Sequence, residues 1–584
     1  MRARRGIGID ALAAVLAAVG GVRGRGRRGV GALLALALAA GLAACQAVPS
    51  EGPVHEGLAS LNQGEQPVQF NPEGPAAGAD QEDIVRGFIR AATSSVDDYA
   101  IAREFLAPAY AAQWQPEDGV FIDEGIQPYA SPSENVGELS LSGLATVDSA
   151  GTLSPLPTGP ETVMRFEFTQ VGGEWRISSA PNGVILDRIS FSAVWTNRQL
   201  YFLTPDNRLV AETRWFLNRA TLSTQIISGL LDGPNEADAQ ALRTGFPSGT
   251  TLASDSVPVN GGIARIEFSP ELLTSEPANM EQVKQQIAAS LQSVPGVTGF
   301  EISVNGAIVD SASVTVPDNQ TRNVENLVTT VIRGDGIGTL SGGEIVPLPR
   351  IGDRIAELNP DAVTLSADRS SAAVRHRGES GSAVTWVSQN DTVTIDLRRG
   401  LFEPALDRFG YVWSYAESDP DRILVQLPGS SPELLRLPGL EDREPLAVRV
   451  SPGGNRLAVL VEGNDGMTAV FVIAIVRDAD QRPVGLGEIA RRELVTSGSP
   501  VDLDWVDETR IVTLSRAGAG VKVTLAPLGQ LPSDIGTVAD AAAVSGGGSR
   551  SLIRVLDGDG RLFGPQGSGW QLQSEDVRLI VRSG

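Results

Sequence analysis

Cysteine and histidine are almost absent from this chain of 584 residues, which contains one cysteine and two histidines. A single cysteine cannot form an intramolecular disulfide, so the domains depend on ordinary apolar cores. His55 lies in a segment rich in proline and glycine that is predicted to be a tether, and His376 lies in the β-rich C-terminal part, so neither a histidine-based catalytic triad nor a two-histidine metal site is expected. We predict no bound metal and no cofactor.

Long apolar runs and an excess of positive charge are also missing. Outside residues 30–44, no segment reaches the ~18 consecutive apolar residues that a membrane-spanning helix needs. The formal charge is −23, and a protein this acidic repels nucleic acid and anionic lipid headgroups. Neither is therefore expected as a binding partner.

The first 45 residues have the pattern of a lipoprotein signal. A cluster of arginines at positions 23–28 precedes a 15-residue apolar run, Val30–Ala44, which ends in Leu42-Ala43-Ala44-Cys45. Basic, apolar and small-residue segments in this order form a secretory signal, and a cysteine at the first mature position can be lipidated. We predict recognition by signal peptidase at Leu42, Ala43 and Ala44. The alternative is an ordinary signal peptide that ends in cysteine by chance.

Lipidation of Cys45 with S-diacylglycerol and an N-acyl chain would hold the mature protein at the extracytoplasmic face of the cell membrane. The modification also leaves no thiol for catalysis. Cleavage removes seven arginines and one aspartate, so the formal charge of −23 becomes −29. Attachment then depends on the acyl chains and not on surface charge.

The mature chain is predicted to contain a tether followed by two small α+β domains. Residues 45–80 are rich in proline, glycine, glutamine and glutamate, which is typical of a flexible tether. In residues 81–191, two helical patterns (81–92 and 99–114) precede alternating strands at 138–144, 162–169 and 174–178. Helices followed by an antiparallel sheet predict an α+β domain, with Trp114 and Trp175 in its core.

Residues 192–316 form the second predicted domain. Two strands flank the turn Thr204–Asn207, and the helix that follows ends at Asp232-Gly233-Pro234. Two more strands flank Asn260-Gly261, and a helix then leads into a strand at 297–304. This order predicts a small mixed sheet covered by two helices.

Residues 317–584 are predicted to be an all-β domain with internal repeats. A polar turn leads into an apolar strand five times, at 365–374, 406–413, 450–460, 503–514 and 555–563. Spacings of roughly 40–50 residues match one four-stranded propeller blade, whereas a β-sandwich repeats less regularly. We favour a β-propeller of about five to six blades over a generic sandwich.

These features together resemble the LpqB lipoproteins of actinobacteria. The signal Leu42–Cys45, the segment Leu230-Leu231-Asp232-Gly233-Pro234 with Phe246–Thr250, and Phe409–Ser414 carry the resemblance. The middle segments resemble a GerMN module, and Phe409–Ser414 resembles the propeller of the family. Membership would imply a role beside the sensor kinase MtrB, whose extracellular part the protein would contact, and an influence on MtrA–MtrB signalling and cell-envelope homeostasis.

Two motifs are assigned to structure and not to function. Asp557-Gly558-Asp559-Gly560 hints at a calcium loop but lacks the other ligands of an EF-hand, so we interpret it as a blade turn. Tyr411, Trp413 and Tyr415 alternate along one strand, which favours a packed blade face over an exposed binding surface.

Two hypotheses of function remain. The first is a membrane-tethered, non-enzymatic accessory protein that contacts the extracellular domain of a sensor kinase. The alternative is a lipoprotein that binds or hydrolyses cell-wall glycan, which requires two carboxyl groups converging in a sugar-sized cleft. The sequence identifies no catalytic residue, no partner-binding residue and no oligomeric state.

Overall fold

A computed structural model describes residues 72–583, apart from residues 126, 158–160, 275–276, 315–328, 335, 342, 379–380, 441–442 and 464–465. The predicted signal and lipidation residues, Leu42 to Cys45, lie outside the described residues, as does most of the predicted tether. Within the described part of the chain, every helix is too short or too polar to cross a bilayer.

The N-terminal domain contains two four-stranded sheets and a long helix, α3. Its elements are α3 (Gln81–Ala91), α4 (Ala100–Arg103), α5 (Pro108–Ala111), η1 (Pro116–Asp118), β1 (Gly119–Asp123), β2 (Tyr129–Ser133), β3 (Val136–Leu141), β4 (Gly143–Asp148), β5 (Leu153–Pro155), β6 (Thr162–Val171), β7 (Glu174–Ser179), β8 (Val184–Asp187) and α6 (Arg188–Val194). One sheet has the order β2-β3-β6-β7 and is antiparallel, as predicted. The other, β5-β4-β1-β8, contains a parallel β1–β8 pair that the prediction missed.

Local sequence explains where the helices of this domain begin and end. The Asp80 side chain caps α3 by accepting a 2.9 Å hydrogen bond from the backbone N–H of Asp83. The single helix predicted over residues 99–114 is wrong, because Pro108 removes a backbone donor and starts the separate turn α5. Trp114 is nevertheless buried, as predicted, whereas Trp175 is only partly buried.

The middle domain contains a mixed sheet and two main helices, in agreement with the prediction. Its elements are β9 (Trp195–Leu203), β10 (Leu209–Leu217), α7 (Leu222–Asp232), β11 (Val259–Asn260), β12 (Ile263–Phe268), η2 (Pro270–Thr274), α8 (Pro277–Leu291), β13 (Gly299–Val304) and β14 (Ala307–Ser313). The sheet order is β11-β12-β13-β14, with β12 and β13 parallel. The hairpin β9–β10 forms a separate two-stranded sheet, and an isolated antiparallel bridge joins Leu203 of β9 to Arg243.

The C-terminal domain is a propeller of six four-stranded blades. The first blade consists of β38 (Val577–Ser583), β15 (Thr330–Arg333), β16 (Gly336–Ser341) and β17 (Glu344–Pro347), and α10 (Ile351–Glu357) follows β17. The second and third blades are β18 (Pro360–Leu365), β19 (Ser371–Gly378), β20 (Gly381–Ser388), β21 (Thr392–Asp396), and β22 (Ala405–Leu406), β23 (Val412–Tyr415), β24 (Arg422–Gln426), β25 (Glu433–Arg436).

The remaining three blades follow in chain order. The fourth is β26 (Pro445–Val450), β27 (Arg456–Glu462), β28 (Thr468–Arg477) and β29 (Pro483–Thr496). The fifth is β30 (Ser499–Asp507), β31 (Arg510–Ala517), β32 (Gly520–Pro527) and β33 (Ser533–Val538). The sixth is β34 (Ala541–Ser545), β35 (Arg554–Asp557), β36 (Leu562–Gln566) and β37 (Gly569–Ser574), with the short turn η4 (Arg550–Leu552) before β35.

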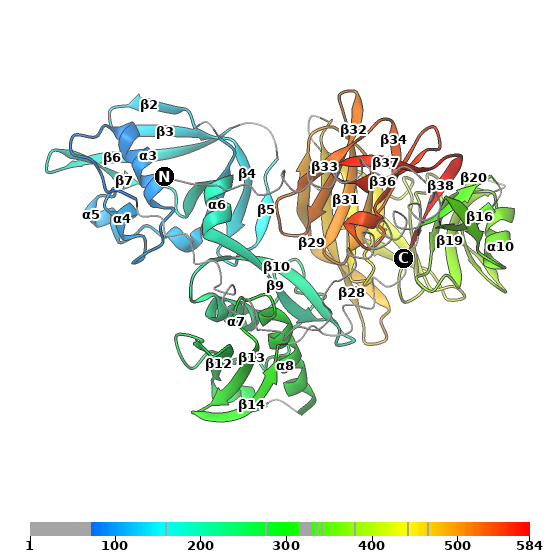
Figure 1. The fold of residues 1–584 in the computed structure, drawn as a ribbon, viewed down its shortest axis with the longest axis horizontal. Helices are drawn as coiled ribbons and strands as arrows, with labels where there is room; N and C mark the ends of the chain where they lie inside the picture. The colour runs from blue at the N-terminus through cyan, green and yellow to red at the C-terminus, as the bar shows by residue number, and fades with distance from the viewer. Residues whose placement is uncertain are drawn as a thin grey trace, which may run out of the picture. The chain divides into compact units, whose positions relative to one another are not determined.

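The C-terminal strand closes the ring of blades. In Figure 1 the red strand β38 lies among the green strands of the first two blades. It pairs antiparallel with β15, from Thr330 opposite Val581 to Ile332 opposite Leu579, and adjoins β18 at Thr364 opposite Arg582. The six innermost strands contact one another in succession around the ring. The first blade is therefore built from both ends of the domain.

Two sequence interpretations of the propeller are confirmed. Trp413 and Tyr415 are buried in a blade core, with Tyr411 packed against it. Asp557 begins the turn between β35 and β36, where its carboxylate accepts hydrogen bonds from the backbone N–H of Asp559 (3.0 Å) and of Arg561 (2.8 Å). That carboxylate is thus committed to the turn.

Candidate functional site

The innermost strands of the propeller surround a cavity of about 240 Å³. It lies where these strands begin, since Asp361, Leu446 and Val501 come from the first residues of β18, β26 and β30. Inner strands line the central channel of a propeller, which is a common place for a ligand or partner to bind. We call this cavity the channel pocket.

Charged and apolar side chains both line the channel pocket, and the apolar ones form one wall. They come from four blades and from the segment before β22, and include Phe402, Leu446, Val501, Leu556, Leu579 and Ile580. Leu446 is 45% exposed. The wall therefore offers apolar contact to a side chain or ring that enters from solvent.

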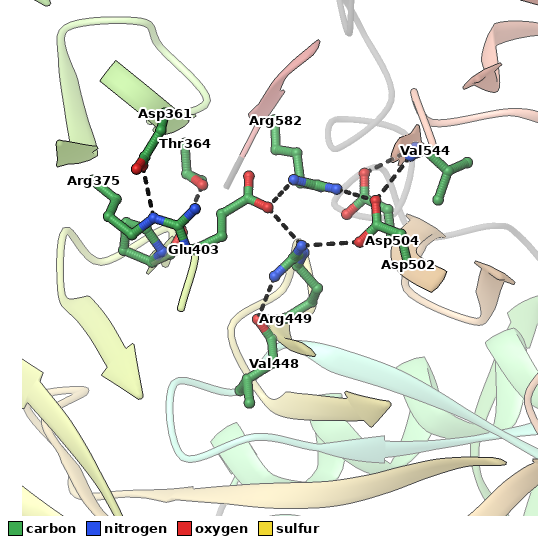
Figure 2. A network of polar contacts seen from close by, with 12 residues as sticks. Asp361, Thr364, Arg375, Glu403, Val448, Arg449, Asp502, Asp504, Val544 and Arg582 are labelled. Carbon is green, nitrogen blue, oxygen red and sulfur yellow. Dashed lines mark hydrogen bonds and ion pairs between the residues drawn. The ribbon is translucent and has the colours of Figure 1, made fainter. Parts of the chain in front are cut away.

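Four charged side chains lie together beside this wall, and we call them the channel quartet: Glu403, Arg449, Asp502 and Arg582. Arg449 donates from Nη2 to Glu403 Oε2 (2.6 Å) and to Asp502 Oδ1 (3.2 Å). Arg582 donates to the same two carboxylates, Nη1 to Glu403 and Nη2 to Asp502 (Figure 2). Two positive and two negative charges thus neutralise each other.

The period of the strands explains how charged residues come to be buried here. In β26, Val448 and Val450 pack into one blade core, so Arg449 between them faces the other side of the strand. In β38, Val581 likewise packs into a core next to Arg582. Because side chains alternate along each inner strand, Arg449 and Arg582 face away from the cores into which the neighbouring valines pack.

Further hydrogen bonds fix the acidic side of the network. Asp502 Oδ2 accepts from the backbone N–H of Val544, and Asp504 Oδ2 accepts from that of Gly546, both at 2.9 Å. Near the pocket wall, Arg375 donates from Nε to Asp361 Oδ1 (2.7 Å). The carboxylates therefore connect the fifth and sixth blades as well as the quartet (Figure 2).

The quartet is buried, and this determines its protonation. The exposed fractions of the side chains are 14% for Glu403, 7% for Arg449, 8% for Asp502 and 6% for Arg582. Burial by itself would raise the pKa of Glu403, but the guanidinium groups of Arg449 and Arg582 hold it below its ordinary value. Glu403 is therefore a carboxylate at neutral pH.

Asp504 behaves differently from its neighbours. Burial raises its pKa to about 6, and the arginines and the Gly546 N–H only partly offset this effect. Asp504 is not among the residues that line the channel pocket. This carboxyl group with a raised pKa is therefore not part of the lining that a substrate would contact.

This arrangement suits binding better than glycoside hydrolysis. A glycosidase uses one carboxylic acid that protonates the leaving group and one carboxylate that attacks or activates water. Glu403, whose pKa is lowered, and Asp502 are instead both held by the same two arginines. Elsewhere in the described residues, no cluster of three or more histidine, cysteine and acidic side chains is arranged to bind a metal ion.

Sequence reasoning missed the channel quartet, although a signal was present. Arg449 in Ala447–Val450 and Asp502 in Val501–Trp505 each interrupt an apolar strand with a charge. A charge flanked by buried apolar residues on an inner strand must find an opposite charge. The sequence does not show which opposite charge, because the partners lie 46 to 179 positions apart.

Comparison with protein families matches three successive parts of the chain. Residues 74–192 match the family described as "Lipoprotein LpqB, N-terminal domain". Residues 199–310 match the family "Sporulation and spore germination", and residues 331–579 match "Lipoprotein LpqB beta-propeller domain". These three matches cover the three domains described above.

Several curated relatives match over most of their length. The Lipoprotein LpqB of Cutibacterium acnes is 25% identical over 527 residues, covering 82% of this chain and 85% of the relative. That of Streptomyces coelicolor is 25% identical over 555 residues, covering 86% and 89%. That of Mycobacterium bovis is 23% identical over 538 residues, covering 85% and 88%.

Solved structures give weaker matches. The first GerMN domain of the sporulation protein GerM from Bacillus subtilis is 18% identical, with 21% of this chain and 98% of that chain covered and a TM-score of 0.18. TolB from Acinetobacter baumannii is 10% identical, with 68% and 75% covered and a TM-score of 0.24.

Proposed function

Because the chain belongs to the LpqB family of lipoproteins, we propose that it is an extracytoplasmic accessory protein that regulates a sensor kinase by direct contact. Acyl chains on Cys45 would hold it at the outer face of the cell membrane, with residues 45–80 as a tether. The partner would be the extracellular domain of a kinase of the MtrA–MtrB type, and the effect would be on cell-envelope homeostasis.

The observation that carries this proposal is the channel pocket, with an apolar wall and charges that are already neutralised. Binding hot spots at protein interfaces are apolar or aromatic side chains that fill such pockets. A polar sugar would have to compete with ion pairs that already exist near the wall, those of Arg449 and Arg582 and the pair Arg375–Asp361. The apolar side chain of a partner loop needs no such exchange.

The rim of the pocket gives the position from which to test the contact. Leu446 is 45% exposed at the channel pocket, and Leu572, on the outermost strand of the sixth blade, is 43% exposed. The two leucines are therefore a matched pair in residue type and exposure. Only one of them lies at the proposed contact.

The experiment places the photocrosslinking residue p-benzoyl-phenylalanine at position 446 or at position 572 of the lipidated protein in cells. We expect a covalent product between position 446 and the extracellular domain of the sensor kinase, identified by mass spectrometry, and little or none from position 572. Equal products from both positions, or a product only from position 572, would refute contact through the channel pocket.

The same experiment tests the alternative function. Crosslinking of position 446 to glycan strands, together with release of reducing sugars from purified cell wall by the isolated protein, would support the glycan hypothesis. Crosslinking to glycan and release of sugars would each contradict the proposal that a protein is the main ligand of the channel pocket.

A further inference from the structure

We propose that the N-terminal domain has a second binding site, for a small organic cation with an apolar body, in a cavity of about 320 Å³. This site lies in a different domain from the channel pocket and does not depend on the proposed contact with a kinase. Helix α3, sheet β5-β4-β1-β8 and strand β6 supply its lining. We call it the N-domain cavity.

Its size and its apolar side point to an organic ligand. Protein interiors pack as densely as organic crystals and leave few voids larger than a water molecule, whereas ligand pockets typically begin at about 300 Å³. Phe88 and Ile89 of α3 and Met164 and Phe166 of β6 line the apolar side. Ile89 and Met164 are only partly buried, so the cavity opens to solvent between them.

A polar side lies opposite, along neighbouring strands. Thr146 pairs with Ser154 across β4 and β5, and both side chains line the cavity. Thr152, which also lines it, is 9% exposed, and its hydroxyl makes no hydrogen bond with any residue in the described ranges. A nearly buried hydroxyl without a protein partner is costly unless a ligand or water completes it.

Two carboxylates give this polar side a negative charge. Gly119 pairs with Asp148 across β1 and β4, so Asp118 and Asp148 lie at the same end of the sheet. Asp118 accepts from Asn182 Nδ2 (2.7 Å), and Asp148 accepts from the backbone N–H of Thr152 (2.8 Å). Both donors are neutral, and no described arginine or lysine forms an ion pair with either carboxylate.

Asp118 ends η1 and Asp148 ends β4, and both are exposed, so their charges can attract a cation from solvent. An ammonium group at this end of the cavity would pair with these carboxylates, and an attached apolar body would cover the side formed by α3 and β6. The lining therefore favours a ligand that has both properties. A purely apolar ligand would leave the carboxylates uncompensated, and a small inorganic cation would leave the apolar side empty.

The test uses two probes that share an indole ring and differ in charge, tryptamine (a cation) and indole-3-acetate (an anion). The protein is the whole chain from residue 45 with Cys45→Ser, because lipid or detergent would absorb the probes. Binding is measured by ligand-observed NMR at low salt and at 0.5 M salt. We expect tryptamine to bind at least ~10-fold more tightly than indole-3-acetate, with the difference reduced by salt.

Four variants locate the site. Met164→Trp fills the cavity and should abolish binding of tryptamine, whereas Val163→Trp, on the exposed face of the same strand, should leave it unchanged. Asp148→Asn should weaken tryptamine by ~3- to 10-fold without affecting indole-3-acetate, and Thr152→Val should weaken both.

Three results would overturn the proposal: equal affinity for the two probes, full binding by Met164→Trp, or no binding of tryptamine at millimolar concentration. Circular dichroism of each variant distinguishes loss of the site from loss of the fold. Because none of these substitutions touches the propeller, the crosslinking result at position 446 remains independent.

Discussion

Replacing Arg582 with methionine should release the C-terminal strand from the propeller. Methionine keeps most of the volume of the side chain but removes one of the two positive charges in the channel quartet. Glu403 and Asp502 then share Arg449 alone, which leaves a net charge of −1 in a place where all side chains are at most 14% exposed. Removing one partner from a buried ion pair typically costs about 3–5 kcal/mol.

The effect is best measured locally, because a protein of several domains does not unfold in one step. Amide hydrogen exchange with mass spectrometry reports the opening of β38 and of β15, with which it pairs. A cost of about 3–5 kcal/mol corresponds to exchange that is roughly 150- to 5,000-fold faster in these two strands. Strands in the fourth blade should change much less.

Arg578→Met is the matched control, since Arg578 lies on the same strand but is exposed and bonds only to the side chain of Asn359 at 2.8 Å. An exposed contact of this kind is worth at most about 1 kcal/mol, so exchange should rise by less than roughly 5-fold. If Arg582→Met behaves like Arg578→Met, the quartet does not hold the strand.

A charge-balanced second variant tests the reason for the effect. Glu403→Gln combined with Arg582→Met removes one negative and one positive charge, and leaves the pair Arg449–Asp502 intact. Exchange in β38 should then be slower than in Arg582→Met alone. Faster exchange in the double variant would show that packing and hydrogen bonding, and not net charge, account for the loss.

The pH dependence has a definite sign. Because the pKa of Glu403 in the folded protein lies below its ordinary value of 4.5, its stabilising contribution is present above that value and disappears as the pH falls through the folded pKa. The difference between the natural protein and Arg582→Met should therefore be largest at neutral pH and become smaller below about pH 4.5.

Three other predictions concern single groups. Asp504→Asn should stabilise β30 by about 1–3 kcal/mol at pH 7.5, measured by amide hydrogen exchange in that strand. The folded pKa of about 6 lies above the ordinary 3.8, and stability is lost as the pH rises between them, so the gain should vanish by pH 4. Asp407→Ala should destabilise β23 by about 3–5 kcal/mol, measured by amide hydrogen exchange in that strand, because the buried carboxylate accepts from the backbone N–H groups of Phe409 and Tyr411, from Trp413 Nε1 and from Arg477. Unchanged exchange in β23 would contradict this. Cys45→Ala should move the protein from the membrane fraction to the medium, and its retention in the membrane fraction would refute anchoring through Cys45.

The blades could be predicted because each contains a local signal. The repeats at 365–374, 406–413, 450–460 and 503–514 all span the turn between the first and second strands of a blade. The fifth repeat, at 555–563, spans instead the turn between the second and third strands of the sixth blade, because the first connection of that blade is long and contains η4. Turn residues and alternating apolar residues suffice for such hairpins.

The first blade could not be predicted in the same way. Its inner strand, β38, lies more than 200 positions after β15, and no local pattern relates the two. The second sheet of the N-terminal domain was missed for the same reason, since β1 pairs in parallel with the distant β8. By contrast, the division of the helix predicted at 99–114 could have been anticipated from Pro108.

The channel quartet depends both on local sequence patterns and on the pairing of strands that are distant in the sequence. The sequence shows that Arg449 and Asp502 interrupt apolar strands, so their burial could be inferred locally, whereas their pairing with Arg582 depends on closure of the ring. Without Arg582, the rest of the quartet (Glu403, Asp502 and Arg449) has one excess negative charge. Arg582 neutralises this charge only when β38 lies in the register that places residue 582 beside Thr364.

A slip of β38 by one residue would turn Arg582 toward the apolar core occupied by Val581, and would leave an unpaired buried charge on each side of the strand. The quartet therefore selects the register in which the two ends of the propeller join.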